Sequence, residues 1–153
     1  MTKGFIQQPG VDFMDTYSPM AKFASVRIIM VVAVRLDLEL HQLDVKITFL
    51  NRDLKEEIYM DQPDGFQIKG QEGKVCRLKK LLYGLKQSSG QWYLKFHPAI
   101  LDIGYEMSPL DHCIYVWRDK EKLALLSLYV DDILLASNSP DMMKETKFFR
   151  IQV

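Results

Sequence analysis

The chain has 153 residues, which is long enough for one domain with a buried core. Hydrophobic residues make up 48% and charged residues 26%, a composition that indicates a globular protein and excludes a disordered one. Its 20 basic residues balance 20 acidic residues, so the sequence lacks the basic excess typical of a dedicated nucleic-acid binder.

Targeting and membrane segments are not expected. Residues 1–10 contain no apolar core of a signal peptide. The longest apolar run, residues 28–34, is far shorter than the roughly 20 residues that a membrane span needs. Cys76 and Cys113 match no zinc-binding spacing, so we expect two reduced, buried thiols in an intracellular protein that is not secreted.

The first half of the chain is expected to hold one helix followed by strands. Residues 1–24 contain several helix breakers and are typical of a loop. Ser25 is the expected N-cap of a helix that repeats apolar residues at helical spacing and ends near Asp37. Alternation and β-propensity predict strands at residues 38–47, 57–60 and 75–78.

The second half is expected to begin with a helix that starts at Ser88 or Ser89 and stops at Gly104, with Pro98 kinking it. Strands are then expected at residues 113–117, 122–130 and 133–137, and a last helix from residues 139–141. This order predicts an α+β fold in which an antiparallel sheet has its helices packed on one face.

The sharpest chemical feature is the pair Asp131–Asp132 between the apolar runs 123–130 and 133–136. Asp is a favoured turn residue, so one of them is explained by a tight hairpin. Two adjacent carboxylates beside apolar strands repel each other, and a divalent cation would relieve this repulsion. A third carboxylate would have to come from another strand, and Asp44 is the candidate, although alone it is typical of a solvated strand end.

Other groupings have simpler interpretations. Trp92, Tyr93 and Phe96 could stack on bases, but their spacing favours a helical core. The run at residues 111–113 contains Asp, His and Cys, but neighbouring residues on a strand point to opposite faces, which argues against a catalytic triad.

Four long segments of the chain occur in the order seen in one known family. They are KGFIQQPGVDFMDTYSPMAKFASVR (3–27), LELHQLDVKITFLNRDLKEEIYMDQPDGF (38–66), VCRLKKLLYGLKQSSGQWYLKF (75–96) and LYVDDILLA (128–136). On these segments the chain resembles the reverse transcriptase of Ty1/copia-type retrotransposons, from Lys3 to about Phe149.

The resemblance implies a partial right-hand polymerase palm with part of the fingers. It also implies an RNA-directed DNA polymerase that transfers nucleotides with two Mg²⁺ ions, Mn²⁺ being an alternative. Asp44 and Asp131 would bind the ions, with Asp132 beside them. The partners implied are an RNA or DNA template with its primer and deoxynucleoside triphosphates, in a cytoplasmic particle or the nucleus; no membrane is implied, and the oligomeric state stays open.

The resemblance also assigns roles in substrate binding. Phe49 would lie under the incoming sugar and exclude a 2′-hydroxyl, and otherwise it is a core aromatic. Tyr129 and Val130 would lie against the primer terminus. Lys86 and Gln87 would contact phosphate, base or template, although unaided the lysine is part of a solvated basic face.

The chain departs from the family pattern at three positions. Gly90 replaces an expected arginine, Arg52 replaces an expected glycine, and Pro98 enters a helix that is usually unbroken. We expect residues 1–153 to form a single truncated domain without the thumb or the ribonuclease H domain. Because contacts to the triphosphate and the primer are missing, we expect this chain to be inactive by itself. Two alternatives to polymerase activity therefore stay open: a catalytically inactive relic that at most binds nucleic acid or protein, and a small metal-dependent phosphatase or nuclease.

Overall fold

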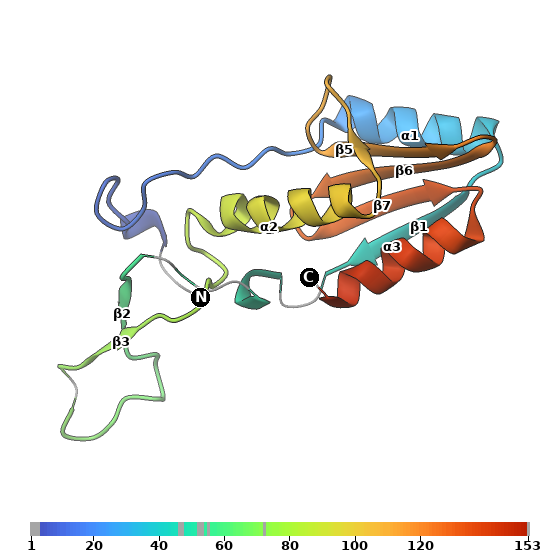
Figure 1. The fold of residues 1–153 in the computed structure, drawn as a ribbon. Coiled ribbons are helices and arrows are strands. Elements are labelled where there is room, and N and C mark those ends of the chain that lie inside the picture. The colour runs from blue at the N-terminus through green and yellow to red at the C-terminus, as the bar shows by residue number, and fades with distance from the viewer. Residues whose placement is uncertain (1–3, 46–47, 52–53, 55, 72, 153) are drawn as a thin grey trace.

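The computed structural model describes residues 4–45, 48–51, 54, 56–71 and 73–152, which form a mixed α/β fold (Figure 1). The helices are α1 (Phe23–Arg35), α2 (Ser88–Asp102) and α3 (Pro140–Gln152), with the short 3-10 helices η1 (Gly4–Ile6) and η2 (Thr48–Asn51). The main sheet contains β1 (Glu39–Asp44), β4 (Glu106–Met107), β5 (Ile114–Asp119), β6 (Lys122–Tyr129) and β7 (Asp132–Ser137). A separate ribbon contains β2 (Tyr59–Asp61) and β3 (Val75–Arg77).

The main sheet is antiparallel and has the strand order β1-β7-β6-β5-β4. Strands β5, β6 and β7 follow one another through hairpins, whereas β1 comes from much earlier in the chain and pairs with β7. The antiparallel sheet predicted from the sequence is confirmed. Strand β4 was not predicted, because two residues are too few to show an alternating pattern.

Helices cover both faces of the sheet, so the prediction of a single covered face is wrong. The ring of Phe23 in α1 contacts Tyr129 of β6, and the ring of Phe96 in α2 contacts Tyr115 of β5. Tyr115 pairs with Leu126, which is three residues from Tyr129 and therefore points to the opposite face. In Figure 1, α1 lies along one side of the sheet, and α2 and α3 lie along the other.

The hydrophobic core lies between the sheet and its helices. Trp92 and Phe96 of α2 are fully buried, which confirms the core interpretation for these two rings, whereas Tyr93 is only partly buried. Of the two free thiols, Cys113 is buried as expected, but Cys76 is only partly buried. Burial, with a smaller effect from the charge of Asp111, raises the pKa of Cys113 to about 12, so its thiol stays protonated and unreactive.

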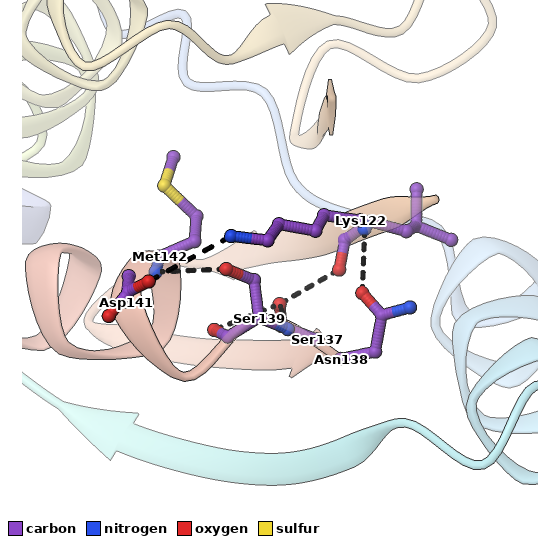
Figure 2. A network of polar contacts seen from close by, with 7 residues as sticks. Lys122, Ser137, Asn138, Ser139, Asp141 and Met142 are labelled. Carbon is purple, nitrogen blue, oxygen red and sulfur yellow. Dashed lines mark hydrogen bonds and ion pairs between the residues drawn. The ribbon is translucent and has the colours of Figure 1, made fainter. Parts of the chain in front are cut away.

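Helix α3 is attached to β6 and β7 by a cluster of polar contacts (Figure 2). The Ser139 hydroxyl accepts a hydrogen bond from the Met142 backbone at 3.4 Å and so caps the helix, close to the predicted start. The Ser137 hydroxyl donates to the Leu123 carbonyl at 2.8 Å, and the Asn138 side chain accepts from the Leu123 backbone at 2.7 Å. None of the described helices is long and apolar enough to cross a membrane.

Asp111 fastens the start of α1 to the start of β5. It is only 7% exposed, and its carboxylate accepts hydrogen bonds from the Ser25 hydroxyl at 2.6 Å and from the backbone of Lys22 and Cys113 at 2.9 and 3.1 Å. Ser25 is therefore not the N-cap: α1 begins at Phe23, and the serine side chain is used for this tertiary contact. Burial alone would raise the pKa of Asp111, but these hydrogen bonds outweigh it and lower the pKa below its ordinary value of 3.8.

Gly90 lies where α2 packs against the backbone of the N-terminal segment. A β-carbon built at this position would lie 2.6 Å from the carbonyl oxygen of Tyr17, far inside van der Waals contact. The departure from the family pattern at Gly90 thus has a packing reason here, since an arginine would force the two segments apart. Arg52 lies outside the described residues. Helix α2 continues through Pro98. Proline has no backbone N–H to donate to the Leu94 carbonyl, but both residues are exposed, so water can bond to that carbonyl instead.

The Asp111→Asn substitution is expected to lower the free energy of unfolding by about 2 kcal/mol at pH 7, because hydrogen bonds to a charged acceptor are lost. The folded state holds the pKa of Asp111 below 3.8, so its stabilisation is complete above that value and is lost as the pH falls through the lower, folded value. Urea unfolding between pH 7 and pH 3 should therefore show a flatter acid dependence in the variant. Equal losses in the variant and in the exposed control Asp102→Asn would contradict this role.

The Gly90→Ala substitution is expected to lower the thermal unfolding midpoint. Alanine gains about 1 kcal/mol of helix propensity over glycine, but its β-carbon must push the Tyr17 carbonyl away, and such overpacking costs about 1–3 kcal/mol. Gly73→Ala is the matched control, because a β-carbon there meets no atom within 4 Å. A midpoint that rises in the Gly90 variant would show that the contact is not tight.

Candidate active site

The pairing of β1 with β7 brings the separate carboxylates of the sequence together. Asp44 is the antiparallel partner of Asp132, so both side chains point to the same face of the sheet. The Val45 backbone donates a hydrogen bond to the Asp131 carbonyl at 3.0 Å, which extends the pairing to the turn. The predicted approach of Asp44 from another strand is therefore found. Figure 1 places the end of β1, η2 and the β6–β7 turn at the same end of the sheet.

The sequence predicts a tight hairpin between β6 and β7, and the structure has one, but its two turn residues lie one position earlier than predicted, so Asp132 is the first residue of β7. Tyr129 pairs with Asp132, which leaves Val130 and Asp131 as the turn residues. Val130 has a φ of +56°, a left-handed conformation that is rare for a β-branched residue. The buried Trp92 indole donates a hydrogen bond to the Val130 carbonyl at 2.7 Å, so a core residue of α2 supports this strained turn.

The carboxylates lie at different depths. Asp44 is exposed, whereas Asp131 and Asp132 are partly buried. The Gln42 amide donates to Asp132 Oδ1 at 3.2 Å, and the Tyr83 hydroxyl donates to Asp131 Oδ2 at 3.4 Å. Two like charges directly opposite each other in a sheet are destabilising, and these neutral donors offset only part of their repulsion.

The chemistry of these side chains fits a hard divalent cation such as Mg²⁺, which prefers carboxylate oxygens. Within the described part of the chain, however, no three His, Cys, Asp or Glu side chains come close enough together to hold a metal ion. Asp44, Asp131 and Asp132 are thus neighbours along one end of the sheet rather than a closed cage.

Two aromatic rings lie beside the carboxylates. Phe49 in η2 is only 6% exposed, and its ring centroid is 4.5 Å from that of Tyr83 in an edge-on contact. Tyr83 is 41% exposed. Burial raises the pKa of Tyr83, the side-chain hydrogen bond with Thr48 opposes this, and the charges of Asp131 and Asp44 raise it further.

Tyr83 was not among the residues predicted for the site. The sequence places it in a loop far from each aspartate, with no periodicity to link them. The available signal was an aromatic residue directly before Gly84, a glycine with a φ of +97°, in a segment that matches the family. Such a turn can present a side chain toward a neighbouring element.

Lys86 and Gln87 contact the N-terminal segment. Gln87 is 1% exposed, accepts a hydrogen bond from the Gln7 amide at 3.1 Å and donates to the Asp12 carbonyl at 3.1 Å. A direct template contact by Gln87 therefore does not fit this structure. The exposed Lys86 amine donates to the Gln7 carbonyl at 3.2 Å and lies 4.9 Å from the centre of the Phe13 ring.

The residues predicted to face the primer flank the carboxylates. Tyr129 is the last residue of β6, remains partly exposed, and has its ring 6.3 Å from that of Phe23. Val130 is partly buried in the turn itself. Both are therefore beside the aspartates, unlike Gln87, which is enclosed by the N-terminal segment.

Comparison with known proteins gives matches over nearly the whole chain. Residues 1–150 match the family described as reverse transcriptase (RNA-dependent DNA polymerase). The chain is 45% identical over 148 residues to the retrovirus-related Pol polyprotein from transposon TNT 1-94 of Nicotiana tabacum, covering 96% of the chain and 11% of that relative. It is 39% identical over 146 residues to the Pol polyprotein from transposon RE1 of Arabidopsis thaliana, covering 95% of the chain and 10% of the relative.

The yeast relatives are more distant. The chain is 31% identical over 151 residues to the transposon Ty1-ER2 Gag-Pol polyprotein of Saccharomyces cerevisiae, covering 95% of the chain and 8% of the relative. The chain thus spans about a tenth of the length of these relatives. No solved structure matches it. Because the family match runs over residues 1–150, the chain belongs to the reverse transcriptase family of Ty1/copia-type retrotransposon Pol polyproteins.

Proposed function

We propose that this chain carries the nucleotidyl-transfer centre of an RNA-directed DNA polymerase. The observation that carries the proposal is the register of β1 against β7, in which Asp44 lies opposite Asp132 and next to the turn that contains Asp131. The substrates would be a primer annealed to an RNA or DNA template and deoxynucleoside triphosphates. The fold would then be the palm of a right-hand polymerase.

The three aspartates are the residues for the metal. Asp44, Asp131 and Asp132 would hold two Mg²⁺ ions, or Mn²⁺, and the bound metal would supply the positive charge that activates the primer 3′-hydroxyl and neutralises the triphosphate. In the chain itself, the hydrogen bond from Gln42 keeps the Asp132 carboxylate in place. The short hairpin, supported by Trp92, keeps Asp131 at the tip of the turn, where a substrate can approach.

The neighbouring side chains would bind and select the substrate. Tyr129, exposed at the end of β6, would support the primer terminus together with Val130. Phe49 would limit the space around the 2′ position of the sugar, and its edge-on contact with Tyr83 would keep its ring from turning away. The exposed Lys86 amine would offer a positive charge to a phosphate.

The first test is primer extension with oligo(dT) on poly(A) and Mg²⁺. The Asp131→Asn substitution is expected to reduce primer extension by the wild-type chain to background, because a neutral amide cannot replace a carboxylate as a ligand for the cation. Asp119→Asn is the matched control, since Asp119 lies next to the hairpin turn at the other end of β6. Full activity in the Asp131 variant would contradict the proposal.

The same assay separates the alternatives. A folded wild-type sample that binds primer–template but does not extend it would favour the hypothesis of a catalytically inactive relic that only binds nucleic acid. Magnesium-dependent hydrolysis without any need for a primer would favour a phosphatase or nuclease.

Phe49→Leu is expected to lower the preference for deoxynucleotides over ribonucleotides about tenfold, because the smaller side chain leaves room for a 2′-hydroxyl. The measurement is incorporation of a single dTTP or UTP opposite adenine. Phe96→Leu is the control, since the Phe96 ring is also buried but packs against Tyr115 of β5 and not beside the aspartates. An unchanged sugar preference in the Phe49 variant would remove this residue from the sugar site.

A further inference from the structure

Tyr83 joins two parts of the candidate site that come from separate elements. Its hydroxyl lies 3.4 Å from Asp131 Oδ2 in the β6–β7 turn, and its ring packs edge-on against Phe49 of η2 at 4.5 Å. It belongs to neither element, because it lies in the loop between β3 and α2. The roles proposed above for the aspartates and Phe49 do not use this residue's hydroxyl.

The direction of the hydrogen bond follows from its partners. An ionised carboxylate can only accept, so the Tyr83 hydroxyl is the donor. The bond is made to Oδ2 of Asp131, so it restricts the rotation of the carboxylate that would bind the cation. Carboxylates that bind metals are commonly oriented by a hydrogen bond of this kind, and its loss typically weakens metal binding about 10–100-fold.

The contact with Phe49 explains how an exposed tyrosine can hold a fixed position. Tyr83 is 41% exposed, and an exposed ring normally samples several rotamers. The Phe49 ring is almost completely buried and offers its neighbour a rigid apolar surface. The hydroxyl of Tyr83 is therefore presented to the turn from a supported ring.

We propose that Tyr83 is a positioning residue that orients the Asp131 carboxylate for binding a divalent cation. This inference rests on the proposed function, since it takes Asp131 to be a metal ligand. It assigns to Tyr83 an effect on metal affinity that a purely structural role would not have. Tyr83 is 41% exposed, so its hydroxyl can bond to water once its hydrogen bonds with Asp131 and Thr48 are lost, and removing that hydroxyl should change folding stability little.

The test is Mn²⁺ binding to the full chain, followed by the electron paramagnetic resonance signal of free Mn²⁺. The variants are Tyr83→Phe, which keeps the ring and removes the hydroxyl, and Asp131→Asn as the reference for a lost ligand. Tyr59→Phe is the matched control, because Tyr59 is an exposed tyrosine on β2. Thermal unfolding of every sample monitors the fold.

The expected result is a roughly tenfold weaker affinity for Mn²⁺ in Tyr83→Phe, a larger loss in Asp131→Asn, and no change in Tyr59→Phe. The unfolding midpoint of Tyr83→Phe should match that of the wild type. If Tyr83→Phe binds Mn²⁺ like the wild type while Asp131→Asn does not, the inference is overturned and the proposed metal site stands. If the wild type does not bind, or if Asp131→Asn binds equally well, the proposed site fails and the inference fails with it.

Discussion

The register between β1 and β7 is the constraint on which the candidate site depends. Asp44 faces Asp132 only in this register, and a shift of one residue would turn the β1 side chains to the opposite face. Burial holds the register, because Leu43 lies opposite Ile133 and both are buried. The apolar residue next to each aspartate thus determines where the carboxylates lie, and substituting the core would move the site.

The β6–β7 turn, which lies beside Asp44, has an unfavourable backbone conformation and two adjacent carboxylates. A left-handed Val130 costs about 1–2 kcal/mol, and the two adjacent carboxylates add their repulsion. The Trp92 indole offsets part of this cost through its hydrogen bond to the Val130 carbonyl, and the hairpin is supported by strands with buried residues on both faces. Strain of this kind is characteristic of functional sites, where surrounding packing maintains a geometry that the local sequence disfavours.

The segment before α1 contacts both α2 and the residues just before β5. Gln7 bonds to Gln87 at the start of α2, Tyr17 touches Gly90, and the Lys22 backbone bonds to Asp111 beside β5. These contacts give a structural role to Gln87, which the resemblance to the family assigns to nucleotide or template binding. Gln87 and Gly90 contribute to the packing of α2 against the N-terminal segment, and Trp92 of α2 donates the hydrogen bond to the β6–β7 turn.

Local patterns in the sequence were enough to predict the three α-helices, every strand except β4, and a tight turn beside Asp131, because periodicity and turn preference depend on near neighbours. The resemblance and the pairing of carboxylates identified Asp44 as the third acid. Only the tertiary structure decided that helices cover both faces of the sheet and that Gln87 is buried. It also decided that Ser25 donates a hydrogen bond to Asp111 instead of capping its own helix, and that the Tyr83 hydroxyl bonds to Asp131. Each of these is a contact between residues far apart in the chain, and such contacts depend on the sheet register and on the side to which each helix packs.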